Sequence, residues 1–276
     1  MGKSIFDGVK FAAIHDRVKN QPRRNAISRF GHLDCRTFLC EVEPAGYPVI
    51  FRHGPAANQD TLFPVLRERH GGAALQVRVG DYADSQTYPH RRHTIAMTFA
   101  AYLDAILALS VELPPYVGNQ PMPPGLLDDL GMPSPPFHPA DRYEPPALWL
   151  GPAGAVTPLH KDGSDNFAAH VFGSKRWVLF PVRDASLLAM ERVENDPWKD
   201  FAASRLDMRG PGGLQVAIAA GAVPIEVFVN GGETLYLPAG WGHFVENVAP
   251  TLMVNTWLGR MQTPGVLRGA TDDHTG

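Results

Sequence analysis

The sequence predicts a mainly β protein with flanking helices, arranged as a barrel or jelly roll. From residue 147 onward, short runs rich in Val, Phe, Leu and Trp alternate with the turn-forming residues Gly, Pro and Asn. Many short strands at such spacing are typical of these all-β folds. A chain of 276 residues is also compatible with one large all-β unit, so we expect a single domain over residues 1–276.

The individual strands follow from apolar runs of four to seven residues that are bounded by turn residues. Only the segment 184–206, between two of these runs, shows helical spacing. The runs predicted as strands are ALWLG, FAAHVF, KRWVLF, IEVFV, ETLYL, HFVEN and LMVNTWL.

Residues 1–146 are expected to form a mixed α/β segment that packs around a core at 147–260, followed by a tail at 261–276. We predict helices over 5–20, 62–72 and 97–109, the last with Thr98 as its N-cap, and strands over 48–52 and 74–82. Eleven of the 26 prolines fall in 113–146. Because long loops in compact domains are usually functional, this segment is expected at the rim of the site.

Composition excludes several classes of function. The net charge of −3 and pI near 6.4 argue against a general nucleic-acid or anionic-membrane binder. Cys35 and Cys40 are too few for a secreted disulfide scaffold. No apolar run is long enough to span a membrane, and the N-terminus lacks a signal-peptide core. A cytoplasmic location is therefore expected.

A candidate metal site begins in the stretch TPLHKDGSDN, where His160 and Asp162 stand two residues apart. The pattern alone is weak evidence for a metal. His32 and Asp34 match it equally well and serve as a decoy. The surrounding sequence must distinguish the two pairs.

The runs FAAHVF and KRWVLF are separated by Gly173-Ser174, which predicts a hairpin with a two-residue turn. In that register Asn166, His170, Lys175 and Trp177 share one face. The polar face could line a ligand site or face solvent, and the hairpin alone leaves both possibilities open.

A second histidine strengthens the metal interpretation. His243 opens a strand after a turn that contains Trp241, and Asn255 on the return strand shares its face if the loop between them is odd in length. A lone buried histidine is more often structural. Together with His160 and Asp162, however, it gives two imidazoles and one carboxylate, the facial triad of non-heme iron(II) oxygenases.

The two motifs together, TPLHKD…N…GSKRWVLFP and GGETLYLPAGWGHFVEN…VNTWL, cover about residues 147–258. Their conjunction resembles the JmjC/cupin-like (cupin 8) 2-oxoglutarate-dependent oxygenases, including the asparaginyl hydroxylase of hypoxia-inducible factor. The resemblance implies a double-stranded β-helix of cupin/JmjC type, with Fe(II), 2-oxoglutarate and O2 as cofactor and cosubstrates. By motif position, it implies His160, Asp162 and His243 as the iron ligands.

The same resemblance implies the residues that bind the cosubstrate. Thr157 and Lys175 match residues that hold the distal carboxylate of 2-oxoglutarate, and Tyr116 matches a third such residue more loosely. Asn166 and Asn255 match polar residues near the cosubstrate.

The resemblance also implies a reaction, the hydroxylation of a C–H bond with release of succinate and CO2. We expect a peptide side chain or an amino-acid-like metabolite as the substrate. A lysine demethylase, or a non-catalytic cupin that binds a metal or small ligand, remains an alternative. Gly242 stands where the family often has a second tryptophan, which predicts a more open rim. The short tail after Trp257 leads us to expect no helix-mediated dimer.

Overall fold

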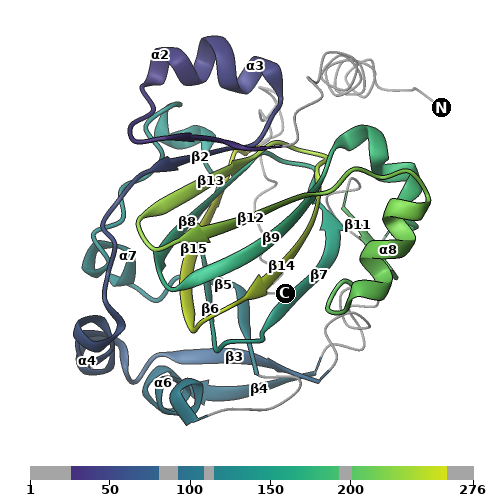
Figure 1. Cartoon of the computed structure of the whole chain (residues 1–276). Helices are drawn as coiled ribbons and strands as arrows, with labels where there is room; N and C mark the ends of the chain where they lie inside the picture. The colour runs from purple at the N-terminus through teal and green to yellow at the C-terminus, as the bar shows by residue number, and fades with distance from the viewer. Residues whose placement is uncertain (1–25, 81–92, 109–114, 193–200, 260–276) are drawn as a thin grey trace, which may run out of the picture.

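The computed structural model describes residues 26–80, 93–108, 115–192 and 201–259. Its centre consists of two β-sheets that lie face to face (Figure 1). The larger sheet has seven strands in the order β1 (Ser28–Phe30), β2 (Val49–Arg52), β13 (Glu233–Leu237), β8 (Asn166–Phe172), β15 (Thr251–Trp257), β6 (Ala147–Gly151) and β5 (Val117–Pro121).

The smaller sheet has six strands, and all of its ladders are antiparallel. Their order is β10 (Met190–Arg192), β11 (Ala202–Ser204), β7 (Val156–Lys161), β14 (Gly242–Asn247), β9 (Ser174–Phe180) and β12 (Ile225–Asn230). A separate two-stranded sheet pairs β3 (Ala74–Val79) with β4 (His93–Thr98).

The strands from β6 to β9 alternate between the two large sheets, and so do those from β12 to β15. This alternation is the jelly-roll arrangement, and it confirms the predicted double-stranded β-helix. All seven runs predicted as strands are strands in the structure. Three strands from the first 146 residues, β1, β2 and β5, extend the larger sheet at its two edges.

The predicted hairpin is wrong, because β8 and β9 belong to different sheets. β8 pairs with β13 and β15, whereas β9 pairs with β12 and β14. The two-residue spacing marks a corner at which the chain crosses from one sheet to the other. For the same reason His243 and Asn255 do not share a face, since β14 and β15 lie in opposite sheets.

Apolar side chains fill the space between the sheets and cover the outer face of the larger sheet. The interior cluster includes Leu235, Trp177 and Val229. On the outer face, one cluster lies under the helices near residues 35–45 and a second lies under two longer helices (Figure 1). The helices that form these covers are α2 (Cys35–Thr37), the π-helical turn Phe38–Val42, α3 (Glu43–Ala45), α4 (Gln59–His70) and α6 (Phe99–Ala108).

The helices predicted over 62–72 and 97–109 are confirmed as α4 and α6. Thr98 caps α6, accepting a hydrogen bond from the Ala101 N–H at 3.2 Å. The predicted helix over 5–20 lies outside the described residues. The segment 113–146 contains β5 and the short helices α7 (Leu126–Asp129) and Ala140–Arg142, so it has more regular structure than its prolines suggested.

The predicted helix over 184–206 is wrong. The described parts of this segment form the last turns of a 3-10 helix, Val182–Leu187, and the strands β10 and β11. The helix of this region lies further on, at α8 (Pro211–Ala219), beside the apolar cluster of the smaller sheet. Among the described residues, no helix combines the length and apolarity needed to cross a lipid bilayer.

Candidate metal centre and cosubstrate site

The three predicted metal ligands converge on the inner face of the smaller sheet. β7 and β14 are neighbours, and their register sets His160 directly opposite His243, with ring centroids 4.0 Å apart. Asp162 follows β7, and its carboxylate oxygens lie 3.9 Å from His160 Nε2 and 3.8 Å from His243 Nε2. One ligand atom from each residue falls within 4.8 Å of the others, which is close enough for a single ion.

Both imidazoles are oriented by backbone carbonyls. His160 Nδ1 lies 2.8 Å from the Pro158 carbonyl oxygen, and His243 Nδ1 lies 3.0 Å from that of Trp241. A carbonyl only accepts, so each Nδ1 carries the hydrogen and each Nε2 presents a lone pair to the site. Burial, together with the nearby His160, lowers the pKa of His243 to about 3. The His243 ring is therefore neutral at pH 7, as a metal ligand must be.

A bulge in β7 brings Thr157 to the same side as His160. On β14, His243 and Val245 are two residues apart and face the same way. Their partners on β7, His160 and Thr157, are three residues apart. The extra residue in β7 shifts the alternation of its side chains by one position, so Thr157 and His160 both face the interior.

Lys175 is the only lysine or arginine among the described residues that is fully buried. Its Nζ donates hydrogen bonds to Tyr116 Oη at 2.9 Å and to Asn247 Oδ1 at 2.8 Å. No carboxylate in the described parts of the chain forms an ion pair with it. Burial lowers the pKa of Lys175 to about 7. A cation held by neutral partners alone is poorly stabilised and would bind an incoming carboxylate.

Further polar groups surround this lysine. Tyr116 is buried, its hydroxyl hydrogen-bonds with Thr157, and burial raises its pKa, so it remains a neutral phenol. Asn166 and Asn255 lie on neighbouring strands of the larger sheet, on the face that points inward. Their Oδ1 atoms are buried without a hydrogen-bond partner among the described residues. Orphaned buried acceptors are uncommon in native structures and favour a bound ligand.

The structure therefore brings together all eight predicted site residues, in the space between the two sheets. Sequence reasoning missed Asn247, which lies directly opposite Lys175 on β14. It lies four residues along β14 from His243, on the same face of the strand, and the register of β9 against β14 was needed to find it. His170 and Trp177 do contact each other, across the interior: Trp177 Nε1 donates to His170 Nε2 at 3.4 Å.

The loop that carries Asp162 is tied to the turn that precedes β14 and His243. The Gly240 N–H donates to the Asp162 carbonyl at 2.8 Å. Asp165, three residues further on, accepts from the Ala239 N–H at 2.8 Å and from Tyr236 Oη at 2.9 Å. These bonds fix the turn before β14 against the loop after β7, so the positions of the carboxylate and of the second imidazole are coupled.

Of two expectations about the surroundings of the site, one is wrong and the other holds only in part. Gly242 does not open the rim, because a Cβ there would lie 3.0 Å from Leu188 and 3.4 Å from Met190, in a buried position. The proline-rich segment sends Tyr116 into the site, but residues 132–146 lie elsewhere. They line a hollow with Phe167 and Ala169, whose side chains point away from the metal ligands.

The decoy pair has a different role. Asp34 is the N-cap of α2, accepting a hydrogen bond from the Thr37 N–H at 2.9 Å. It is exposed, as is His32. The only His/Cys/Asp/Glu cluster of metal-binding geometry found among the described residues is that of His160, Asp162 and His243.

The residues of the site fit both Fe(II) and 2-oxoglutarate, the metal and the cosubstrate of the family that the sequence resembles. Two imidazoles and one carboxylate on one side of an ion leave coordination positions open, as a non-heme iron(II) site requires. Lys175, a buried cation without an acidic partner among the described residues, suits the carboxylate of a small dicarboxylate in a dry space.

Comparisons with known proteins agree with this geometry. Residues 36–262 match the model of the cupin-like domain family. The chain is 33% identical over 113 residues to human HSPB1-associated protein 1, covering 40% of this chain and 23% of that protein. It is 26% identical over 240 residues to lysine-specific demethylase JMJ30 of Arabidopsis thaliana, covering 84% and 54%.

A third relative is the 2-oxoglutarate and iron-dependent oxygenase JMJD4 of Danio rerio, 30% identical over 114 residues, which are 40% of this chain and 26% of that protein. The chain spans between about a quarter and about a half of the length of these relatives. The family match covers most of the chain and includes every residue of the site. The chain thus belongs to the cupin-like domain family, of the JmjC type to which its 2-oxoglutarate- and iron-dependent oxygenase relatives also belong.

Proposed function

We propose that this protein is an Fe(II)- and 2-oxoglutarate-dependent dioxygenase that hydroxylates a C–H bond of its substrate. One observation supports the proposal above the others. Lys175 is a buried cation without an acidic partner among the described residues, and it lies in the same interior as the triad His160, Asp162 and His243. A fold that only needed a filled interior would be more stable with an apolar residue at this position.

In this proposal the triad holds iron, and Lys175, Tyr116 and Thr157 hold the distal carboxylate of 2-oxoglutarate. The bound set supplies oxidation by O2: one oxygen atom enters the substrate C–H bond, and the other enters 2-oxoglutarate, which leaves as succinate and CO2. The apolar walls of the interior exclude water, which strengthens the contact between Lys175 and the carboxylate.

The substrate would approach from the side of Asp162, whose side chain is 21% exposed whereas both histidines are nearly covered. We favour a peptide side chain or an amino-acid-like metabolite. This rests on the fold and on the resemblance, since a fold does not determine its substrate. We further propose that the protein acts in the cytoplasm and does not bind nucleic acid. The tail at 261–276, on which the expectation about a dimer rested, lies outside the described residues.

Lysine demethylation is the second candidate, favoured by the match over 84% of this chain to a protein named as a lysine-specific demethylase. Both reactions begin with hydroxylation of a C–H bond and differ in the carbon attacked. On an N-methyl group, the hydroxylated product loses formaldehyde. The mass of the product therefore separates them: hydroxylation adds one oxygen atom, and demethylation removes a methyl group.

The test is succinate release from 2-oxoglutarate with Fe(II), assayed against peptide and metabolite libraries. The parent protein should release succinate with a matching substrate, and Asp162→Ala should abolish turnover. Asp34→Ala is the matched control: it removes the same carboxylate from the decoy pair, costs about 1 kcal/mol of helix capping and should leave turnover unchanged. Turnover that survives Asp162→Ala, or protein that binds metal without any 2-oxoglutarate turnover across the libraries, would contradict the proposal.

A further inference from the structure

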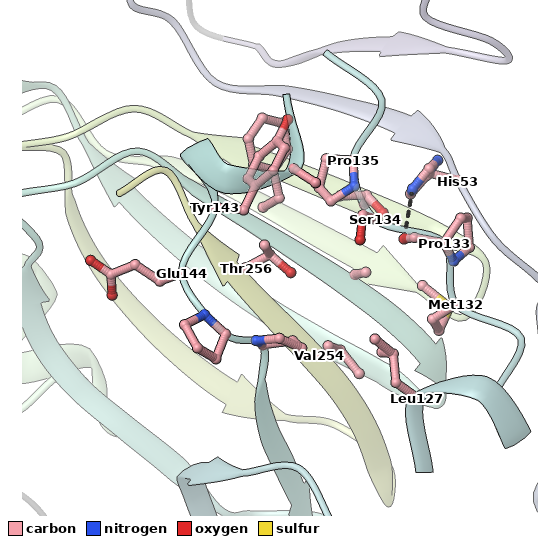
Figure 2. A pocket seen from close by; sticks show the side chains of 16 residues that line it. His53, Leu127, Met132, Pro133, Ser134, Pro135, Tyr143, Glu144, Val254 and Thr256 are labelled. Carbon is pink, nitrogen blue, oxygen red and sulfur yellow. Dashed lines mark hydrogen bonds between the residues drawn. The ribbon is translucent and has the colours of Figure 1, made fainter. Parts of the chain in front are cut away.

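The strand β8 presents alternate side chains to the two sides of the larger sheet. Phe167 and Ala169 line the hollow on the outer side, which Figure 2 shows from close by. Asn166 and His170 therefore point to the interior that holds the metal centre. His170 is fully buried there, although it is not one of the three clustered metal-binding residues. Its polarity needs another explanation, because an apolar side chain would fill the same space at lower cost.

The backbone determines which nitrogen of His170 carries the hydrogen. Its Nδ1 lies 3.1 Å from the Ala168 carbonyl oxygen, which can only accept, so Nδ1 is the donor. His160 and His243 make the same bond to the carbonyl two residues earlier. Burial lowers the pKa of His170 to about 3, so the ring is neutral at pH 7 and its Nε2 carries a lone pair. His170 therefore offers one acceptor to the interior.

The donor to this acceptor is the indole of Trp177, which comes from the other sheet. Trp177 Nε1 donates to His170 Nε2 at 3.4 Å, so the bond runs from β9 to β8 across the interior. Trp177 is only 2% exposed, and its N–H is shielded from bulk water. A rotated indole would turn Nε1 away and leave a buried donor unpaired, which is costly. The bond to His170 therefore fixes the orientation of the Trp177 ring.

The Trp177 ring in turn packs against the metal ligand His243. β14, which carries His243, lies between β7 and β9 in the smaller sheet. From the β9 side, the Trp177 ring stacks on the imidazole with centroids 5.9 Å apart and an interplanar angle of 29°. From the β7 side, the ring of His160 lies at a centroid distance of 4.0 Å. His243 is thus flanked by one ring from each neighbouring strand.

These flanking rings matter because one hydrogen bond does not fix the plane of an imidazole. The bond from Nδ1 to the Trp241 carbonyl directs His243 Nε2 into the site, but the ring can still tilt about that bond. A stacked indole of fixed orientation limits the tilt. Mutation of a group that directly orients a metal-binding histidine typically costs about 10–100-fold in metal affinity or activity. His170 acts through one further ring, so a smaller effect is expected.

We propose that His170 is a positioning residue of the metal centre: its bond to Trp177 Nε1 holds the indole against His243 and keeps that ligand directed into the site. The inference rests on the function proposed above, since it requires the metal site formed by His160, Asp162 and His243. It adds to that function a residue of the larger sheet, whereas both ligand histidines belong to the smaller one.

The test is a titration of Co(II), a spectroscopic substitute for Fe(II), into the full chain without O2 and without 2-oxoglutarate. The affinity and the visible absorption of bound Co(II) report on the ligands independently of turnover. His170→Leu removes the acceptor, and Trp177→Phe removes the donor while keeping an aromatic ring. Each should weaken Co(II) binding roughly three- to tenfold and alter the absorption band. His170→Gln supplies another acceptor and should restore an affinity within about twofold of the parent.

The double variant separates a positioning role from a purely structural one. If His170 acts through the indole N–H, His170→Leu should have no further effect on Co(II) binding in the Trp177→Phe background. His70→Leu is the matched control. His70 in α4 is also buried and hydrogen-bonded, to Asp129 at 2.8 Å, but it lies outside the metal centre. Its loss should lower stability and leave Co(II) affinity unchanged.

The outcomes distinguish this inference from the function on which it rests. Parent-like Co(II) affinity and absorption in His170→Leu, or an equal effect of that change in both backgrounds, would overturn the inference and leave the metal centre intact. If His170→Leu does not fold, Trp177→Phe decides alone, and parent-like Co(II) binding by it would overturn the inference. A parent that binds no Co(II), or an Asp162→Ala variant that binds it as tightly, would refute the metal centre and this inference together.

Discussion

At the scale of single residues, the site is an arrangement of groups that are costly to bury alone. Lys175 in the interior has only neutral partners, Tyr116 and Asn247. Nearby, the amide oxygens of Asn166 and Asn255 lack partners among the described residues. Each of these groups lowers the stability of the ligand-free protein: Lys175 becomes favourable when an anion binds beside it, whereas the two amide oxygens need a hydrogen-bond donor. The site is therefore prepared for a ligand at a cost in stability.

The lowered pKa of Lys175 predicts that 2-oxoglutarate binding takes up a proton. In the free protein burial sets this pKa to about 7, so at pH 8 the amine is mostly neutral. A bound carboxylate favours the charged form and raises the pKa. Affinity should therefore fall as pH rises above about 7, by at most about tenfold per unit. Calorimetry at pH 8 in two buffers of different ionisation enthalpy should show uptake approaching one proton. Proton exchange near zero at pH 8 would show that Lys175 is already charged.

Much of the site could be predicted from residue spacing together with the family resemblance. The motif positions led to the triad, Thr157 and Lys175, because metal and carboxylate binding leave few choices of side chain. Asn247 could not be found in this way. An asparagine is common near strand ends, and only the register of β14 against β9 sets it opposite Lys175.

At the scale of elements, the short apolar runs were predicted correctly and their pairing was not. A hairpin signal assumes that consecutive strands pair, which is the usual case. In this jelly roll β8 and β9 follow each other but lie in different sheets, so the polar residues predicted to share a face instead point at one another across the interior. Local sequence specifies a strand and a sharp turn, whereas the choice of partner depends on distant strands, the nearest of which places Ile225 opposite Leu179.

Gly173 makes the corner between β8 and β9, and we predict that Gly173→Ala is strongly destabilising. Its φ is 80°, and a Cβ there would lie 2.1 Å from the Pro250 carbonyl oxygen, which is backbone and cannot move aside cheaply. We expect a loss of at least about 1–3 kcal/mol in the free energy of unfolding. Gly72→Ala is the control, since a Cβ at Gly72 meets nothing within 4 Å and its φ is not positive. Equal urea midpoints for the two variants would refute this account of the corner.

The error over 184–206 has a similar cause. The residue pattern of this segment suggested a helix, but Leu188 is fully buried and lies against Gly242 beside the metal centre. The actual helix, α8, starts with a proline that follows Gly210 and contains two further glycines, which gave it a weak helix signal. In both segments, 184–206 and α8, tertiary packing set the secondary structure and overrode the local helix propensity.

At the scale of the whole molecule, the buried polar interior makes stability depend on pH. His170 is fully buried, and burial, followed by the nearby charge of Lys175, lowers its pKa to about 3. In the unfolded chain its pKa returns to the ordinary histidine value of 6.5. Between pH 3 and 6.5 the unfolded state therefore binds a proton that the folded state does not, so stability rises with pH across this window and is lost on acidification.

His170→Gln should remove this contribution. The metal-free parent should lose about 1.4 kcal/mol per pH unit from this residue as pH falls from about 6 to 4, beyond any loss from other groups. The variant should therefore show a shallower dependence of its unfolding free energy on pH in urea titrations. His32→Gln, at an exposed histidine, should keep the slope of the parent. Identical slopes for His170→Gln and the parent would mean that His170 is protonated in the folded state.

The central claim is that Lys175 binds the distal carboxylate of 2-oxoglutarate beside the iron triad, and titration of 2-oxoglutarate into the metal-loaded protein without O2 tests it most directly. Removing one partner of a buried ion pair costs about 3–5 kcal/mol. Lys175→Met should therefore weaken 2-oxoglutarate binding by roughly 10²–10³ or more while metal binding persists. The control is Arg176→Met. Arg176 lies next to Lys175 on β9, on the outer side of the sheet, and pairs with Glu226 and Glu246 of the two neighbouring strands. Its loss should leave 2-oxoglutarate affinity unchanged. A Lys175→Met protein that binds 2-oxoglutarate as tightly as the parent would contradict the account.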